Sequence, residues 1–381
     1  MILARQVITV HNSGMALPEP QEPQAHLGPF LEPESQRDQF DSHELAIVLS
    51  HYDLGQIEQI REYRRGSRRA PKVRIKSQSG RYLLKRRAPG RDDPYRVAFA
   101  QSLQLFLAER NYPIAALVGT RGTNNSLLQL NGRIYELFHY APGTRYDESV
   151  AQTHEAGRVL GALHRLLATF KPPFDPPVGA YHGAAGLEVQ LSQIPDAVAA
   201  VEPQADRKML KKICVFLHKT YNEAAKRVDK FGYRSWPKVI IHGDWHPGNL
   251  LFHDSKIAAV LDFDSARLEP RMADIANAVL QFSMRMSWPD DPDHWPVGLD
   301  AERVRALVRG YHETAGDRLT DQELASLPWL IVEALIMESV VPIAATGSFG
   351  RIRASSFLRM VERESRWIVP RAEKLVRYLG G

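Results

Sequence analysis

The sequence is poor in cysteine and has no long uninterrupted apolar run. Cys214 is the single cysteine among 381 residues, which excludes an internal disulfide and a zinc-thiolate cluster and favours a reducing cytoplasm. The most apolar stretch, 327–345, is interrupted by Glu333, Glu338 and Pro342, so it indicates a buried helix and not a membrane span. Neither a secretory signal nor an internal repeat is evident.

An excess of charge is also missing. The net charge is +5, with 44% hydrophobic and 24% charged residues, as in soluble globular proteins, and the length suits two lobes. The charge is not evenly spread, because between Arg61 and Arg96 there are many more Arg and Lys residues than Asp and Glu. These basic residues could serve a nucleic acid or attract a polyphosphate ligand. Without aromatic interleaving or a helix-turn-helix pattern, we favour the polyphosphate and expect no nucleic-acid or membrane partner.

The chemically informative stretch runs from Val239 to Asp264. Two short apolar runs, beginning at Val239 and Ile257, predict strands, and a polar loop with a Pro-Gly turn separates them. The loop and the end of the second run carry His242, Asp244, His246, Asn249, Asp262 and Asp264. The polar side chains therefore gather between and just after two predicted strands.

This grouping suits phosphoryl transfer, which needs a carboxylate to orient the accepting hydroxyl and oxygen ligands for magnesium. Asp244 can be the carboxylate, and Asn249 and Asp262 can be the ligands. A zinc site on His242, Asp244 and His246, with Asp262 added, is the alternative, but it would usually need a further histidine. Asp264 has two readings, a second metal ligand or a partner for Arg267.

The pattern His242-Gly243-Asp244-x-His246-x-x-Asn249, followed by Asp262, resembles the Brenner-type motif of the aminoglycoside phosphotransferase and choline kinase superfamily. The homoserine-kinase-like and spore-coat kinase-like branches are the most similar in character. The resemblance implies an α+β, bilobal, protein-kinase-like fold and an enzyme that uses ATP and Mg²⁺ to phosphorylate a hydroxyl of a small molecule.

Roles for the motif residues follow from the resemblance. Asp244 would be the catalytic base, and Asn249 and Asp262 the magnesium ligands. Three further residues would structure the loop, namely His242, His246 and Asp274. Asp274 would do so while capping the helix that it begins. The acceptor stays open among homoserine-type, choline- or aminoglycoside-type and sugar substrates.

The chain divides into three expected parts. Residues 1–40 are rich in proline and predict a loosely packed extension, 41–139 a nucleotide-binding lobe, and 140–381 a catalytic and substrate-binding lobe. In the small lobe we expect a helix over 42–51 capped by Ser42, a three-stranded meander over 55–63, 71–77 and 81–87, and strands over 114–118, 126–129 and 133–138.

Nucleotide contacts are expected in the small lobe. By the resemblance, Gly66 and Ser67 would cover the phosphates, and backbone groups from Glu136 to Phe138 would meet the adenine. Lys85 would bind the α- and β-phosphates, with Arg87, on the same strand face, as the fallback. The helix predicted over 96–110 lacks the glutamate that usually pairs with such a lysine. Gln101 could orient Lys85 in its place, although less strongly.

The large lobe is expected to be helical, over 150–170, 206–230, 300–315, 321–345 and 357–379. Two residues are candidate substrate contacts, Tyr181 and His182. Acidic and aromatic residues that could meet a cationic acceptor are Glu333, Glu338, Trp329 and Trp288. The missing helix glutamate motivates a rival hypothesis, a kinase-like nucleotide-binding scaffold with little turnover.

Overall fold

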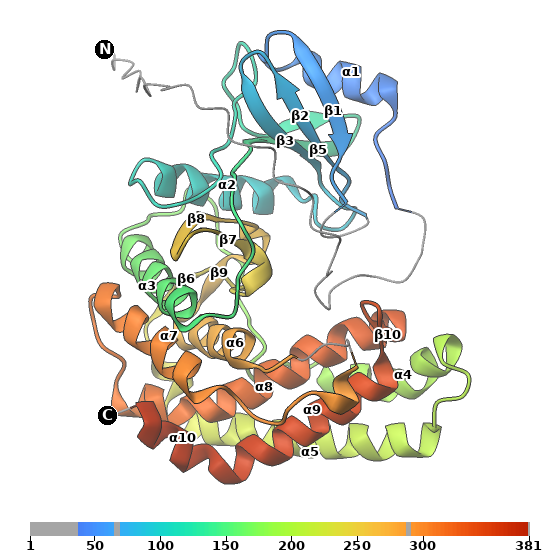
Figure 1. The fold of residues 1–381 in the computed structure, drawn as a ribbon, viewed down its shortest axis with the longest axis vertical. Helices are drawn as coiled ribbons and strands as arrows, with labels where there is room; N and C mark the ends of the chain where they lie inside the picture. Colours follow the sequence, from blue (N-terminus) through green and yellow to red (C-terminus); the bar gives the residue numbers. More distant parts are fainter. Residues whose placement is uncertain (1–36, 65–68, 287–290, 380–381) are drawn as a thin grey trace.

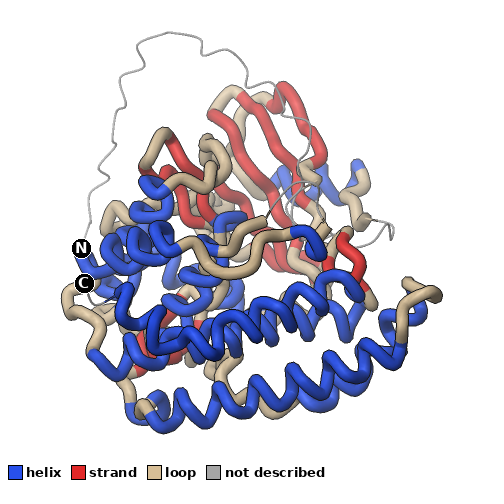
Figure 2. The backbone as a smooth tube through the Cα atoms, turned by 60° about the horizontal axis from the view of Figure 1, so that its bottom comes forward, coloured by secondary structure: helices blue, strands red, loops and turns tan. Residues whose placement is uncertain are grey.

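The structure is a computed structural model that describes residues 37–64, 69–286 and 291–379. Gly66, Ser67 and Trp288, together with most of the expected N-terminal extension, lie outside these residues. In the described part, a sheet with two helices lies at one end of the molecule and most other helices gather at the opposite end (Figures 1 and 2). This is the mixed α+β arrangement that the sequence predicts.

An antiparallel five-stranded sheet forms the N-terminal end, with strand order β1-β2-β3-β5-β4. Its strands are β1 (Ile57–Glu62), β2 (Lys72–Ser77), β3 (Gly80–Arg86), β4 (Leu128–Leu130) and β5 (Arg133–His139). The predicted meander is confirmed as β1-β2-β3. The predicted strand over 114–118 is instead an irregular segment with isolated bridges to Val260 and Phe138.

Two helices pack on this sheet, α1 (Ser42–Ser50) and α2 (Pro94–Ala108). The side chain of Asp41, and not that of Ser42, caps α1 by accepting a hydrogen bond from the Glu44 amide at 2.7 Å. A small apolar core joins α1 to the sheet. In contrast, α2 contributes Phe99, Leu103 and Leu107 to the large core of the helical end. Figure 1 shows α2 between the sheet and the short strands of the molecule's centre.

Two short antiparallel strand pairs occupy this centre, β6 with β9 and β7 with β8. Their bounds are β6 (Lys238–Ile241), β7 (Leu250–His253), β8 (Lys256–Val260) and β9 (Arg267–Pro270). The runs beginning at Val239 and Ile257 are therefore strands, as predicted. They do not pair with each other, however, because each finds its partner in a short strand that the sequence did not predict.

The C-terminal end is mainly helical. Its helices bury their apolar faces against one another in one continuous core. Its helices are α3 (Val150–Leu167), α4 (Leu187–Val201), α5 (Arg207–Lys230), α6 (Met272–Ser283), α7 (Ala301–Thr314), α8 (Asp321–Thr346), α9 (Ala354–Ile368) and α10 (Ala372–Leu379), with a minor two-stranded pair of β10 (Ser348–Phe349) and β11 (Ile352–Arg353). Helix α4 was not predicted. The single helix expected over 357–379 is divided into α9 and α10 by a 3-10 turn that contains Pro370.

Helix α8 is the one described helix long and apolar enough to cross a membrane. About two thirds (67%) of its most apolar window is buried inside the protein. Its apolar surface is therefore covered by neighbouring helices, which agrees with the expected core helix.

Candidate active site

The carboxylate of Asp274 holds the loop after β6 in place. Asp274, on the first turn of α6, accepts hydrogen bonds from the backbone amides of His242 at 2.7 Å and Gly243 at 2.8 Å. No side chain caps α6, so the expected capping role of Asp274 is wrong. Its two hydrogen bonds to the loop agree with the loop-structuring role that was also expected of it. Asp274 also lies 3.1 Å from His164 of α3, whose other ring nitrogen is 3.0 Å from the Tyr311 hydroxyl.

The start of the loop allows no side chain at position 243. Gly243 has a φ of +75°, and a Cβ there would lie 2.2 Å from the Ser265 carbonyl oxygen. His242 is fully buried, packs against Trp245 and Phe263, and its Nε2 lies 3.0 Å from the Leu261 carbonyl oxygen. These contacts give His242 the loop-structuring position expected for it and tie the loop to the strand end that carries Asp262.

Asp244 emerges from this loop with its carboxylate partly exposed. The side-chain amide of Asn249 donates to the Asp244 carbonyl at 2.9 Å and to its carboxylate at 3.0 Å. His246 Nε2 lies 3.5 Å from the same carboxylate, while its Nδ1 accepts from the Gly248 amide. Burial would raise the pKa of Asp244, but the hydrogen bond and charge of His246 outweigh it and lower the pKa to about 2. The carboxylate is therefore ionised at neutral pH.

Asp262 lies at the end of β8 in a left-handed conformation, with φ +60° and ψ +68°. This conformation is costly for a residue other than glycine and often marks a functional site. Its carboxylate is 3.5 Å from the Lys85 ammonium, and the charge of Lys85 holds the pKa of Asp262 well below its usual range. The backbone joins it to Asn249, because the Leu261 amide donates to the Asn249 carbonyl at 2.8 Å. Asp244, Asn249 and Asp262 thus converge.

Lys85 and Arg87 both reach across from the sheet to Asp264. Lys85 Nζ lies 2.8 Å from one carboxylate oxygen of Asp264, and Arg87 Nη1 lies 2.7 Å from the other. Arg267 instead donates to the carbonyls of Ser265 and Gly179. Asp264 therefore pairs with Lys85 and Arg87 and not with Arg267. The prediction of an Arg267 partner is wrong, and the prediction of a second metal ligand at Asp264 stays a prediction.

Arg87 is also bound to Glu136, a fully buried carboxylate on β5. Its Nε and Nη2 donate to the two oxygens of Glu136 at 2.6 and 2.9 Å. Gln101 of α2 donates to the same carboxylate at 2.9 Å and accepts from Ser126 at 2.7 Å. Gln101 therefore contacts Glu136, and the expected hydrogen bond to Lys85 is absent among the described residues.

The placement of Glu136 and Phe138 bears on the adenine contact expected of their backbone. Both lie inside the sheet, opposite Lys85 and Leu83 of β3. Backbone hydrogen bonds flank this region on both sides, from the Arg87 amide to the Ile134 carbonyl and from the Tyr140 amide to the Arg81 carbonyl. In an antiparallel pair every second residue bonds to the same neighbouring strand, so the backbone groups of Glu136 and Phe138 point toward β3. A ligand would find free backbone groups more readily just after the strand.

Magnesium is the metal that suits the converging oxygens. Both side-chain donor contacts of Asn249 go to Asp244, so its amide oxygen stays available as an acceptor beside the Asp262 carboxylate. The zinc alternative fits poorly, since the described residues include no group of three or more His, Cys, Asp or Glu suited to a metal. The Nε2 atom of His242 is also engaged by the Leu261 carbonyl oxygen.

Tyr181 and His182, the candidate substrate contacts, are engaged in packing contacts. The Tyr181 hydroxyl donates to the Ala273 carbonyl at 2.9 Å. His182 lies 3.0 Å from both oxygens of Glu333 and 3.3 Å from Asp229, which joins α8 to the end of α5. These bonds use the polar groups of Tyr181, His182 and Glu333 within the helical end, so the structure assigns them a scaffold position.

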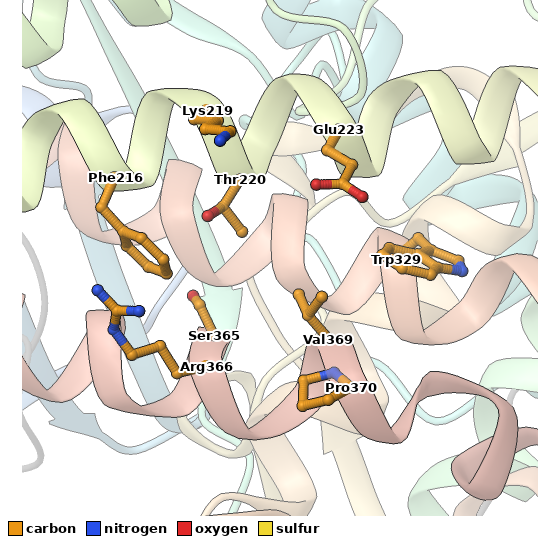
Figure 3. Close-up of a pocket in the computed structure, with 9 residues that line it drawn as sticks. All are labelled: Phe216, Lys219, Thr220, Glu223, Trp329, Ser365, Arg366, Val369 and Pro370. Carbon is orange, nitrogen blue, oxygen red and sulfur yellow. The ribbon is translucent and has the colours of Figure 1, made fainter.

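One hollow lies apart from the residues of the catalytic loop, none of which line it. It has a volume of about 460 Å³ and lies between α5, α8 and the C-terminal part of α9 (Figure 3). Trp329 lines it, under the guanidinium of Arg227. Glu338 is nine residues further along α8, half a turn away in rotation, so it faces the opposite side of the helix. Trp329 therefore does not share a site with Glu338.

Two charged residues near the loop gain importance from the structure. Burial, together with the negative charge of Asp244, raises the pKa of Glu338 to about 7, while His246 and Arg267 act in the opposite direction. No described residue forms an ion pair or hydrogen bond with its carboxylate. Lys72, directly opposite Lys85 in the sheet, was missed from the sequence because strand pairing is not visible there.

The sheet end, the helical end and the acidic loop between them form the fold of the kinase-like phosphotransferases. Within that class, the chain belongs to the phosphotransferase enzyme family, whose family model matches residues 59–324. The resemblance read from the loop motif is thereby confirmed.

Curated relatives and solved structures agree with this assignment. The chain is 28% identical to a homoserine kinase of Granulibacter bethesdensis, covering 75% of this chain and 81% of that protein. It is 24% identical to a homoserine kinase of Zymomonas mobilis, covering 62% of this chain and 66% of that protein, just under two thirds of its length. The fold is similar to a microcompartment-associated aminopropanol kinase (TM-score 0.65, 16% identity, 88% and 98% of the two chains). It is also similar to an amicoumacin kinase in complex with AMP-PNP, Ca²⁺ and Ami (TM-score 0.62, 15% identity, 88% and 94% of the two chains).

Proposed function

We propose that this protein transfers the γ-phosphoryl group of ATP to a hydroxyl of a small molecule and requires Mg²⁺. The observation that carries the proposal is the convergence of Asp244, Asn249 and Asp262 at the catalytic loop and the strand end beside it. Lys85 of the sheet lies 3.5 Å from Asp262. In the reaction, the bond between the γ-phosphorus and the bridging oxygen breaks and a bond to the acceptor oxygen forms, which leaves ADP and a phosphate ester.

Asp244 orients the acceptor hydroxyl and takes its proton late in the transfer. A pKa of about 2 makes it a weak base. In a loose transition state, however, positioning matters more than base strength. His246, 3.5 Å away, holds the carboxylate in its ionised form. Bound Mg²⁺ would be held by the Asn249 amide oxygen and the Asp262 carboxylate, where it would supply positive charge to the phosphates.

The nucleotide lies, on this proposal, between residues 41–139 and the loop. Lys85 and its cross-strand neighbour Lys72 supply positive charge to the phosphates. For the adenine edge, the carbonyls of His139 and Tyr140 and the amide of Ala141 replace the backbone groups of Glu136 and Phe138, which face β3. The amides of His139 and Tyr140 already donate to the Ala116 and Arg81 carbonyls. Residues 140–381 carry the catalytic loop and the acceptor site.

The acceptor is a small hydroxyl compound that carries an amino group. Glu338 supports this choice, because it is a carboxylate without an ion-pair partner among the described residues and its pKa responds to the charge of Asp244. An ammonium group close to it would satisfy the buried charge. The homoserine kinase relatives make L-homoserine the first compound to test. We expect the enzyme to act in the cytoplasm.

The decisive experiment measures ATP consumption with L-homoserine and a panel of amino alcohols for the wild type and Asp244→Asn. Removal of the base and orienting group is expected to lower kcat by about 10²-fold or more, with little change in the melting temperature. Asp254→Asn is the matched control, because Asp254 is on the neighbouring β7–β8 turn and its side chain is 92% exposed. Near-normal turnover in Asp244→Asn would refute the assigned role.

The rival function is a nucleotide-binding scaffold with little turnover. Its motivation was the absence of a carboxylate on the helix that should support Lys85. The structure weakens that motivation, because Lys85 has two carboxylate neighbours from the opposite side, Asp262 and Asp264. A wild-type protein that binds Mg·ATP but turns over no acceptor in the panel would favour the scaffold.

A further inference from the structure

Beside the catalytic loop, the charged side chains form one continuous chain of contacts into the sheet. From Lys85 it runs through Asp264, Arg87 and Glu136 to Gln101, and each link is between 2.6 and 2.9 Å. Three of its members are nearly or fully closed to solvent, since the side chains of Asp264, Arg87 and Glu136 are 13, 4 and 0% exposed. Neither phosphoryl transfer nor metal binding requires the last three links directly.

We propose that Glu136, held by Gln101, is a positioning residue that fixes Arg87 and thereby sets Asp264 and Lys85 in place for the nucleotide phosphates. This inference rests on the proposed function. It gives the carboxylate on β5 the task that a helix carboxylate would otherwise perform, and it gives Gln101 of α2 an indirect part in that task.

The hydrogen-bond geometry of Arg87 supports this reading. Its Nε and Nη2 form a fork on Glu136, a planar arrangement that fixes the orientation of the guanidinium. The remaining nitrogen, Nη1, is thereby directed at Asp264. A lysine could not hold both carboxylates in a defined geometry. Because Glu136 is fully buried, it needs Arg87 and Gln101 to remain charged.

Lys85 depends on this arrangement once a nucleotide is bound. In the described structure it has two carboxylate neighbours, Asp264 at 2.8 Å and Asp262 at 3.5 Å. If Asp262 turns to a metal ion, Asp264 becomes the anion that holds Lys85 on the protein side. Helix α2 offers no Asp or Glu for the purpose. The location of the ammonium then follows the location of Asp264, which Arg87 holds from behind.

A merely structural cluster and a positioning cluster differ in one measurable ratio. Loss of structure weakens the binding of adenosine and ATP alike. Loss of positioning weakens the binding of ATP, whose phosphates meet Lys85. It leaves the binding of adenosine unchanged, because adenosine has no phosphate. The readout is therefore the ATP-to-adenosine affinity ratio, measured by calorimetry on folded protein with Mg²⁺ present.

Glu136→Gln is expected to lower this ratio about tenfold, a difference of about 1.4 kcal/mol. Gln101→Glu is the sharper variant, since it restores a carboxylate to the helix. If position 101 served Lys85 directly, the ratio would hold or rise. On our proposal the ratio falls, because the new carboxylate would lie at the 2.9 Å separation that Gln101 has from Glu136. The double variant Gln101→Glu/Glu136→Gln removes the repulsion between two carboxylates, but its amide at position 136 has one acceptor oxygen and cannot accept both Arg87 hydrogen bonds. Its ratio should therefore stay close to that of Glu136→Gln.

Gln104→Glu is the matched control, a buried position on the same helix whose side chain bonds only to the Ala100 carbonyl among the described residues. It should lower the melting temperature without changing the ratio. If Glu136→Gln does not fold, Gln101→Met, which keeps the Arg87–Glu136 pair, should lower the ratio in the same direction. Unchanged ratios in the folded variants would overturn the inference alone. A wild type that binds ATP no better than adenosine would overturn the proposed function with it.

Discussion

At the residue scale, the site combines three cations with three carboxylates in a small volume. The cations are Lys72, Lys85 and Arg87, and the carboxylates are Glu136, Asp262 and Asp264. For Lys85 and Arg87, burial lowers the pKa, but the neighbouring carboxylates outweigh it and raise the pKa. Both stay charged at any physiological pH. Lys72 differs, because burial and the charge of Lys85 lower its pKa to about 8.

The first prediction concerns nucleotide affinity and pH. Lys72 is mostly charged at pH 7 and mostly neutral at pH 9, so its attraction for phosphates is lost as the pH rises through 8. The wild-type affinity for Mg·ATP should fall by about three- to tenfold between pH 7 and pH 9. Lys72→Met removes the titrating group, and its affinity should be low and nearly constant. Isothermal titration of both proteins at the two pH values tests this; parallel curves would contradict it.

The same residue makes a separate prediction for stability. The pKa of Lys72 in the folded protein lies below the ordinary lysine value of 10.5. The unfolded chain therefore binds the proton more tightly, and stability rises with pH between 8 and 10.5. Lys72→Met should therefore raise the melting temperature of the nucleotide-free protein at pH 7, and the gain should shrink toward pH 10. A variant that is less stable than the wild type at pH 7 would contradict this sign.

At the element scale, the catalytic loop is supported by a tight helix pair behind it. Glycines let α3 and α7 approach closely: a Cβ on Gly157 would lie 1.9 Å from the Leu307 carbonyl oxygen, and one on Gly310 2.0 Å from that of His154. Helix α3 carries His164, which contacts Asp274 beneath the loop. The spacing of these helices is thereby linked to the position of Asp244.

Gly157→Ala is expected to force the two helices apart. Overpacking of this kind costs about 1–3 kcal/mol, more than the better helix propensity of alanine returns. The free energy of unfolding should fall by about 2 kcal/mol, and kcat should fall because the support of Asp274 shifts. Gly186→Ala is the control, since no atom lies within 4 Å of a Cβ at that position. Equal stability of the two variants, measured by urea unfolding, would show that the helix contact is not tight.

The elements also show what could be read from the sequence. The motif from His242 to Asp262, the meander and the long amphipathic helices have local signals, and they were predicted. The partners of Asp264 and Glu136 could not be, because they are brought together by strand pairing and by the packing of α2, which leave no local pattern. Gln101 shows the limit well: its sequence position suggested Lys85, whereas the fold turns it toward Glu136.

At the scale of the whole molecule, the basic stretch from Arg61 to Arg96 proves to have two faces. Lys85, Arg86 and Arg87 are buried and paired with carboxylates, and Lys72 lies opposite Lys85. Other basic residues of the stretch, such as Arg61, Lys76 and Arg81, are exposed. A polyphosphate ligand between the sheet and the loop would meet the first group, since Lys85 and Arg87 both contact Asp264 there. That such a ligand is what the basic stretch serves stays a prediction.

The last prediction uses the molecule as a whole. The sheet and the helical end are joined by α2, whose apolar side chains belong to the helical end's core, so a ligand between them should stabilise the entire chain. ATP and Mg²⁺ together should raise the melting temperature by more than the sum of their separate effects. At a concentration near 100 times Kd, the joint stabilisation should be about 2–3 kcal/mol in the free energy of unfolding. EDTA should remove the extra stabilisation. Asp262→Asn should retain the response to ATP alone and lose the gain from Mg²⁺, because it removes the carboxylate assigned to the metal while Lys85 and Lys72 remain. A variant that keeps the full joint response would place the metal on other ligands, whereas a wild type without any joint response would contradict a magnesium-dependent nucleotide site between the sheet and the loop.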